Sequence, residues 1–255
     1  MTHRDDELWA RRSSSFGASA RAYAEHRPDY AGEAIAWCVA GAERPVVDVL
    51  DLGAGTGALT GGLLAAGLSV TAVEPDPAML AELARQWPGV PAAVGRAEAV
   101  PLPDAAVDAV FVATAFHWFD ADRALPEIAR VLRPGGVLAV LYDLVDTTVP
   151  WAAELDRLSR TSVSLPPAEA EYAPAYAGFG PVQLGRFAHG HLRTAESMTA
   201  TIGTHSHTLV ISPEERSEVL GRVRAFLDAQ PETSDGEFHH PLVTVAGRAV
   251  VNRRD

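Results

Sequence analysis

The sequence predicts an α/β fold in which helices cover both faces of a doubly wound, mostly parallel sheet of seven strands. Two observations lead to this prediction. Apolar, β-branched segments alternate with helix-forming ones from residue 46 to residue 142, and such alternation implies parallel strands joined by right-handed crossovers. The first strand ends in an acid and three alternating glycines, Gly53, Gly55 and Gly57, a turn that no bulky residue could make.

Each element of the first half follows from its local pattern. The β-branched runs predict strands, and the Ala- and Leu-rich stretches between them predict helices. A polar N-terminal stretch with a helix at 31–42 is expected to form a helical cap over residues 1–45, ahead of a ligand-binding core at 46–145. In the core, strands are expected at 46–52, 70–73, 92–94, 107–113 and 137–142, and helices at 58–66, 78–87 and 121–132.

The regular alternation stops after residue 145. Helices are expected at 151–158, 197–207 and 213–229, and strands at 182–192 and 242–251. Residues 146–255 are therefore predicted to supply the last two strands, one of them open to antiparallel pairing, with the helices inserted between them as a lid. Cap, core and lid together are expected to form a single domain.

Composition narrows the function. The 255 residues carry a formal net charge of −12 without a basic stripe, which disfavours nucleic acid as a partner. The charged first twelve residues are unlike a signal peptide, and no window reaches the ~18 apolar residues of a membrane span. With a single cysteine, Cys38, and no third ligand beside His205 and His207, no metal site is expected. We expect a cytoplasmic protein that acts on a small molecule; its oligomeric state stays open.

The glycine turn is compatible with two cofactors. Residues Gly53 to Ala58 fit the dinucleotide pattern G-x-G-x-x-G/A, and Asp51 to Gly57 equally fit the acid-x-Gly-x-Gly-x-Gly pattern of a nucleoside-sulfonium site. Glu74 ends the second strand and suits both, because a carboxylate accepts hydrogen bonds from vicinal ribose hydroxyls. The turn by itself leaves both open.

Four further features favour the sulfonium cofactor. Asp51 is unfavourable beside a pyrophosphate but suits a cationic ligand, and Ala97-Glu98 follows the third strand, where an acid can receive an adenine amino group. The segment 115–120 follows the fourth strand, and Arg133-Pro-Gly-Gly136 precedes the fifth. In combination they resemble the class I S-adenosylmethionine (SAM)-dependent methyltransferases over Val46 to Tyr142, which implies a Rossmann-like fold.

Two shorter matches refine the resemblance. The segment Tyr23 to Tyr30 is similar to one that often closes over the cofactor in this family. Phe116-His117-Trp118-Phe119 further resembles the small-molecule branch that includes trans-aconitate methyltransferase-like proteins.

The resemblance implies a set of cofactor-binding residues. The glycines would line the methionine and ribose, Glu74 the ribose hydroxyls, and residues 114–116 the methionyl tail. Asp76 could instead cap the helix at Pro77, and Met79 could be a helix-core residue. The expected SAM contacts are Asp51, Gly53, Gly55, Gly57, Glu74, Asp76, Met79, Ala97, Glu98, Thr114, Ala115 and Phe116.

His117 is the expected general base by position, with packing at the strand end as the alternative. Tyr30, Trp118 and His205 are expected to contact the substrate. The predicted function is methyl transfer from SAM to a small-molecule acceptor, a secondary or natural-product metabolite, with O-methylation favoured. A nicotinamide-dependent oxidoreductase on the same fold, and a non-methylating SAM-fold binding protein or cyclase, are the alternatives.

Overall fold

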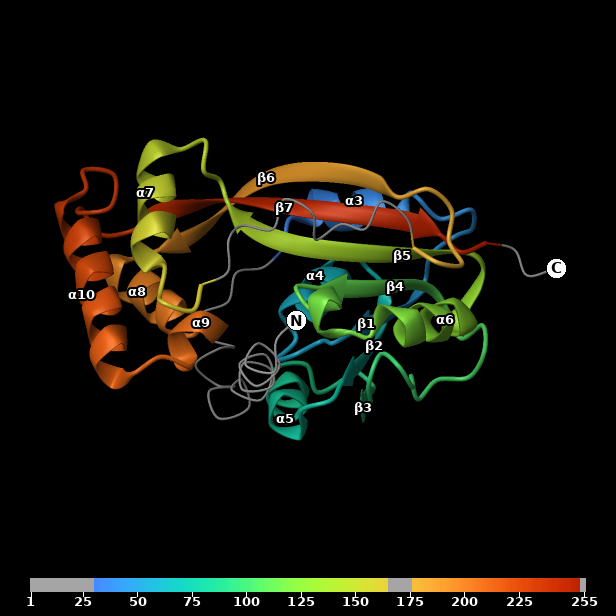
Figure 1. Cartoon of the computed structure of the whole chain (residues 1–255). Helices are drawn as coiled ribbons and strands as arrows, with labels where there is room; N and C mark the ends of the chain where they lie inside the picture. The colour runs from blue at the N-terminus through green and yellow to red at the C-terminus, as the bar shows by residue number, and fades with distance from the viewer. Residues whose placement is uncertain (1–29, 165–175, 253–255) are drawn as a thin grey trace. The chain divides into compact units, whose positions relative to one another are not determined.

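The computed structural model describes residues 30–164 and 176–252 (Figure 1). Most of the predicted closing segment, from Tyr23 to Asp29, lies outside the described residues. The helices are α3 (Gly32–Val39), α4 (Ala58–Ala65), α5 (Pro77–Gln86), α6 (Ala121–Val131), α7 (Pro150–Ser159), α8 (Ala195–Gly203), α9 (Ser206–Leu209) and α10 (Pro213–Ala229). The strands are β1 (Asp48–Leu52), β2 (Ser69–Glu74), β3 (Ala92–Val94), β4 (Val107–Ala113), β5 (Leu132–Val145), β6 (Gln183–Arg193) and β7 (Phe238–Val250).

These strands form one seven-stranded sheet in the order β3-β2-β1-β4-β5-β7-β6. The first five pair in parallel, with Asp51 beside Ala72 of β2 and beside Phe111 of β4. The order reverses at β1, and the glycine turn follows the carboxyl end of that strand, where doubly wound sheets bind their ligands. The predicted fold class is confirmed.

The last strand, β7, is the antiparallel one. Val251 directly after it donates its N–H to the carbonyl oxygen of Gly136 at 2.9 Å, whereas Asp146 donates to the carbonyl oxygen of Pro241 at 3.1 Å. The partner number falls as the residue number in β5 rises, which is the signature of antiparallel pairing. The strand inserts between β5 and β6.

Helices bury both faces of the parallel part. On one face Phe111 packs in a cluster with Ile35 of α3 and Leu63 of α4. On the opposite face the neighbouring Val110 packs with Ile128 of α6. Successive strand residues point to opposite sides, so a strand buried on both faces is apolar throughout, as the sequence of β4 is.

β5 begins earlier than predicted, at Leu132 in place of residue 137. Val107 pairs with Leu132, but Ala109 already pairs with Val137, so the strand bulges through Pro134-Gly135-Gly136. A Cβ on Gly136 would lie 2.7 Å from the carbonyl oxygen of Asp108. The proline-glycine break therefore shapes a bulge within the strand, because the backbones of β4 and β5 approach too closely there for a side chain.

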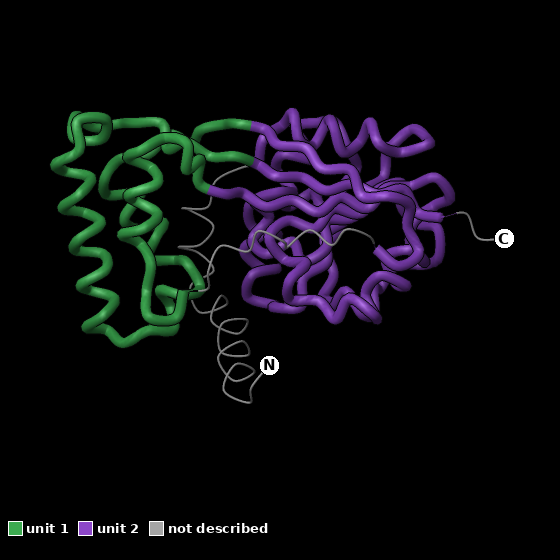
Figure 2. Tube along the Cα trace, turned by 45° about the horizontal axis from the view of Figure 1, so that its top comes forward, with its two compact units in different colours: residues 1–28, 145–168, 188–243 green, residues 29–144, 169–187, 244–255 purple. Residues whose placement is uncertain are grey.

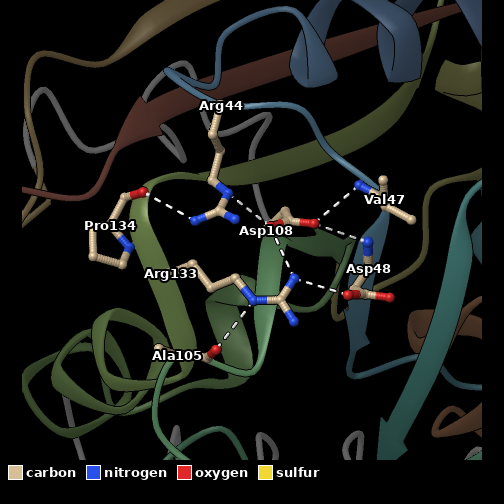
Figure 3. Close-up of polar contacts among 7 residues, drawn as sticks. All are labelled: Arg44, Val47, Asp48, Ala105, Asp108, Arg133 and Pro134. Carbon is tan, nitrogen blue, oxygen red and sulfur yellow. Dashed lines mark hydrogen bonds and ion pairs between the residues drawn. The ribbon is translucent and has the colours of Figure 1, made fainter.

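Asp108 joins the amino-terminal ends of β1, β4 and β5 (Figure 3). Its nearly fully buried carboxylate accepts hydrogen bonds from the N–H groups of Val47 and Asp48, both at 3.0 Å. It also pairs with Arg44 at 2.8 Å and with Arg133 at 3.0 Å. Burial raises the pKa of Asp108, but these hydrogen bonds and Arg133 outweigh it, so the net shift is downward. This cluster lies at the strand edge opposite the glycine turn.

Two predictions in the later part of the chain need correction. The expected helix 197–207 is two helices, because α8 ends at Gly203 and His205 is the N-cap residue of α9. The last strand was expected to begin at residue 242, but β7 already starts at Phe238. Inside the strand, alternation buries His240 and exposes His239.

The described chain divides into two compact units (Figure 2). One contains residues 30–144, 176–187 and 244–252, and the other contains residues 145–164 and 188–243. The second unit has its own apolar cluster, in which Leu155 of α7, Ile202 of α8 and Val223 of α10 are buried. Across the described ranges, no helix combines the length and apolar character needed to cross a bilayer.

Candidate functional site

The glycine turn is built from left-handed backbone. Gly53, Gly55 and Gly57 have φ values of 73°, 57° and 91°, a region that costs other residues strain. Packing excludes a side chain at two of these positions as well. A Cβ on Gly53 would lie 2.8 Å from the Cβ of Ala115, and one on Gly57 would lie 2.9 Å from the indole of Trp87. The turn therefore requires glycine for its conformation and its packing.

Several N–H groups of the turn are hydrogen-bonded to oxygen atoms of the protein itself. Gly53 and Ala54 both donate to the carbonyl oxygen of Val73, at 2.8 and 3.1 Å, and Gly57 donates to that of Ala54 at 2.9 Å. Gly55 donates to a carboxylate oxygen of Glu74 at 3.0 Å. A pyrophosphate site relies on such N–H groups pointing at the ligand, so this arrangement disfavours a dinucleotide.

Asp51 is a buried acid with an unsatisfied oxygen. Thr60 of α4 donates its hydroxyl to Oδ2 at 2.6 Å, whereas Oδ1 has no hydrogen-bond partner among the described residues. Burial raises the pKa of Asp51 to about 7; the Thr60 hydrogen bond opposes this shift, and the charge of Glu74 adds to it. A cation next to this carboxyl would relieve both the desolvation and the repulsion.

Glu74 connects the two loops that follow β1 and β2. Its oxygens accept hydrogen bonds from the N–H groups of Gly55 at 3.0 Å and Asp76 at 2.9 Å. Burial raises the pKa of Glu74, and these two bonds partly oppose the shift. The bonds fix the carboxylate at the mouth of the turn, and each oxygen retains a second lone pair suited to a ribose hydroxyl.

Asp76 and Met79 both have structural roles in α5. Asp76 is the N-cap residue, and its carboxylate accepts from the N–H groups of Ala78 at 2.8 Å and Met79 at 3.4 Å. Met79 is buried, with its methyl group 3.3 Å from where a Cβ of Gly55 would lie. Both residues thus border the turn, and adenine contacts from them stay a prediction.

Ala97 and Glu98 border the site from the loop after β3. Ala97 is buried in the same cluster as Ala115 and Phe116. Glu98 Oε1 accepts a hydrogen bond from the N–H of Asp120, the N-cap residue of α6, at 2.9 Å. Burial raises the pKa of Glu98, but hydrogen bonds and the nearby arginine outweigh it, so the net shift is downward. Glu98 therefore stabilises the start of α6.

Thr114 has an unusual conformation at the end of β4. Its φ of 51° places a β-branched residue in the left-handed region, at a cost of about 1–3 kcal/mol. Its N–H donates to the carbonyl oxygen of Leu141 at 2.8 Å, and its hydroxyl lies 2.9 Å from the hydroxyl of Tyr30. Two expected site residues, Tyr30 and Thr114, are thus brought together.

Aromatic side chains support the loop after β4. Phe116 is buried, with its ring centroid 5.7 Å from that of Phe119 and 5.2 Å from that of Tyr176. The Tyr176 hydroxyl is buried without a hydrogen-bond partner among the described residues, and burial raises its pKa to about 12. Tyr176 was not expected at the site, since no local motif marks it.

His117 lies on the single helical turn Phe116–Trp118 and is exposed. Its ring centroid is 4.6 Å from that of Trp118 and 6.1 Å from that of Tyr142. Trp118 is half-buried against the core. His205 belongs to the other compact unit, where its ring lies 5.4 Å from that of His207. In the described ranges, no group of three His, Cys, Asp or Glu could hold a metal ion.

The geometry fits a cationic nucleoside better than a dinucleotide. The unsatisfied oxygen of Asp51 suits an ammonium or sulfonium group, and the fixed carboxylate of Glu74 suits a ribose. Thr60 was not expected in the site, although it lies in the first turn of α4, directly after the glycine turn, where its hydroxyl reaches the carboxylate of Asp51. SAM would meet both acids at the turn.

Comparisons with known proteins agree with this reading. A model of a methyltransferase domain matches residues 50–140. An uncharacterized methyltransferase of Mycobacterium tuberculosis is 38% identical over 247 residues, covering 94% of this chain and 96% of that protein. A malonyl-[acyl-carrier protein] O-methyltransferase of Methylococcus capsulatus is 46% identical over 101 residues, 37% of each chain.

A solved structure shares the fold. It comes from a protein of Anaeromyxobacter dehalogenans that is provisionally assigned as a type II methyltransferase, with a TM-score of 0.61 and 27% identity. The match covers 88% of this chain and 96% of that chain. From the acid pair at the glycine turn and this similarity along almost the whole chain, we conclude that the chain belongs to the methyltransferase family and is a SAM-dependent methyltransferase.

Proposed function

We propose that the protein transfers a methyl group from SAM to an oxygen atom of a small carboxylic acid in the cytoplasm, a secondary or natural-product metabolite. The cofactor part is supported by the buried pair Asp51 and Glu74, with one unsatisfied oxygen on Asp51. The acceptor part is supported by two similarities. The malonyl-[acyl-carrier protein] O-methyltransferase is similar over about a third of the chain, and Phe116–Phe119 resembles the trans-aconitate methyltransferase-like branch.

SAM supplies a methyl group on a positively charged sulfur. The protein then has to orient that group and exclude water, and proximity alone can contribute about 7–11 kcal/mol. In our proposal Glu74 holds the ribose and Asp51 faces the cationic end. Thr114, Ala115 and Phe116 support the methionyl tail, and Ala97 and Glu98 approach the base.

The acceptor decides whether a base is needed. A carboxylic acid is already ionised at neutral pH, so its oxygen can accept the methyl group without losing a proton. A hydroxyl acceptor would need a base, for which His117 is the candidate, contributing about 10²–10⁴-fold. With a carboxylate acceptor, we propose that His117 and Trp118 bind the substrate.

Methyl-labelled SAM tests the acceptor directly. The protein is incubated with trans-aconitate, with a malonyl thioester, and separately with a metabolite extract, and products are identified by mass spectrometry. Base-labile methyl esters are expected, and His117→Ala should raise the KM of the acceptor while kcat stays within about tenfold, because no proton is removed. Label appearing only as base-stable ethers or amines would contradict carboxylate O-methylation.

A further inference from the structure

One face of β7 holds helix α3 along its length. Residues two apart in a strand point to the same side, and Thr244, Ala246 and Arg248 share the side that faces α3. Arg248 donates to the carbonyl oxygen of Trp37 and lies 3.9 Å from the centroid of its ring. Ala246 is fully buried in the cluster that contains Ile35. β7 thus fixes the middle and the end of α3.

Thr244 fixes the start of the same helix. Its side chain is 0% exposed, and its hydroxyl accepts a hydrogen bond from the N–H of Ala31 at 3.0 Å. The same hydroxyl donates to Oδ1 of Asp143 at 2.5 Å. Ala31 is the N-cap residue of α3 and makes no side-chain cap. Asp143 therefore orients a hydroxyl that in turn orients the first residue of the helix.

Tyr30 immediately precedes this anchored residue. Its hydroxyl lies 2.9 Å from the hydroxyl of Thr114, the residue with left-handed backbone after β4. Consecutive residues are thus tied to different strands, Tyr30 to the end of β4 and Ala31 to β7. Because the peptide unit between them is planar, the contact of the Ala31 N–H with Thr244 orients the peptide that carries the Cα of Tyr30, and the Tyr30 ring extends from that Cα to Thr114.

We propose that Thr244 and Asp143 are positioning residues for methyl transfer, which place the Tyr30 hydroxyl beside Thr114 to hold an oxygen atom of the acceptor. The inference rests on the proposed function, since it assigns these residues to the acceptor side of that reaction. A phenol hydroxyl donates to a carboxylate, so the matching acceptor is an oxygen-bearing small acid.

Thr244→Val and Thr244→Ser form a matched pair of variants. Valine keeps the shape and removes both hydrogen bonds, whereas serine keeps the hydroxyl. Asp143→Asn tests the second positioning residue, because it changes the acceptor that orients the Thr244 hydroxyl. Thr233→Val is the control, because it removes another buried hydroxyl, which donates to the carbonyl oxygen of Leu227 at 2.6 Å.

Fluorine spectra of protein labelled with 3-fluorotyrosine report on Tyr30 without any acceptor. The chain has five tyrosines, and Tyr30→Phe assigns its signal. Thr244→Val is expected to shift the Tyr30 signal and to speed hydrogen exchange at the Ala31 amide about tenfold or more. Thr244→Ser and Thr233→Val are expected to change neither. An unmoved Tyr30 signal in Thr244→Val would overturn the proposal.

Kinetic and binding measurements then separate an effect on the acceptor from an effect on the cofactor. With the methylated acid as acceptor, kcat/KM is expected to fall about tenfold or more in Thr244→Val and Tyr30→Phe and to recover in Thr244→Ser. Calorimetric SAM affinity is expected to stay within about threefold. An equal loss of SAM affinity would overturn the acceptor-side assignment. If no acid is methylated, the proposed acceptor fails, whereas the fluorine and exchange results still decide whether Thr244 positions Tyr30.

Discussion

The carboxylate of Glu74 accepts a hydrogen bond from the backbone N–H of Gly55 at 3.0 Å, so the acid that ends β2 is tied to the glycine turn that follows β1. The same carboxylate accepts from the N–H of Asp76 at 2.9 Å. Through these two bonds a single side chain sets the distance between two loops. Its orientation depends on ionisation, because protonation turns one of the two oxygens into a hydrogen-bond donor and removes the charge that strengthens both bonds.

Glu74→Gln is expected to weaken SAM binding about 10- to 100-fold, equivalent to about 1.5–3 kcal/mol for a hydrogen bond to a charged group. The amide keeps the shape but turns one acceptor into a donor facing a backbone N–H. Calorimetry with SAM measures the change. Glu154→Gln is the control, since Glu154 forms an exposed pair with Arg157 on the surface of α7; a similar loss of affinity in this variant would contradict the role of Glu74.

Asp51 is expected to make stability depend on pH between about 4 and 7. Burial, reinforced by the charge of Glu74, raises its pKa in the folded protein to about 7, above the 3.8 of an unfolded chain. The folded state therefore binds this proton more tightly, and the stabilisation is present below pH 4 and lost as the pH rises to about 7. Urea unfolding at several pH values should show a shallower decline for Asp51→Asn. Identical profiles would rule out Asp51 as the source.

Proton release on SAM binding follows from the same shift. A cation beside Asp51 favours the carboxylate, so near pH 6.5 binding should expel a proton from the wild-type protein. Calorimetry in buffers of different ionisation enthalpy counts that proton. Asp51→Asn should release less, and an unchanged count would mean that the cationic end of SAM does not approach Asp51.

Asp108→Asn is expected to destabilise the fold by about 1.5–3 kcal/mol, because it removes the buried charged acceptor that the half-buried Arg44 and Arg133 share. SAM affinity of the folded variant should not change, since this cluster lies at the opposite strand edge. Denaturant unfolding and calorimetry measure the two quantities. Asp104→Asn, at the exposed pair with Arg130, should change neither. A loss of SAM affinity in Asp108→Asn would contradict a purely structural role.

Thr114→Gly and Thr114→Val separate strain from hydrogen bonding. Glycine adopts a φ of 51° without strain, so Thr114→Gly relieves the backbone strain. The same substitution loses the hydroxyl contact and gives the unfolded chain more backbone entropy. These effects oppose each other, so the free energy of unfolding should change by less than about 1 kcal/mol. Valine keeps the strain and loses the contact with Tyr30, so it should destabilise by about 1 kcal/mol or more. Thermal unfolding measures both. Equal effects of the two substitutions would refute the strain at Thr114.

Local patterns predicted the sheet and the glycine turn that follows its first strand. Glu74 was expected from its place at the end of β2, and it indeed contacts the glycine turn. Such features are predictable because strand alternation and left-handed turns depend on neighbouring residues. The start of the last strand was predicted at residue 242 and not at Phe238, because the polar pair His239-His240 hides the alternation that buries only His240.

Contacts between distant residues could not be predicted from one sequence. Arg133 was recognised only as part of a motif before β5, yet it binds Asp48 and Asp108 from other strands. The link from Ala31 to Thr244 joins residues 213 positions apart. No local pattern encodes such pairs, because the fold alone brings them together.

A crystal structure of the protein with S-adenosylhomocysteine would show whether Glu74 and Asp51 hold the cofactor at the glycine turn. We predict that the ribose hydroxyls lie within hydrogen-bond distance of Glu74 and that the amino-acid end of the ligand lies on the side of Asp51. A ligand bound away from the turn between Gly53 and Gly57, or a ribose with no contact to Glu74, would contradict it.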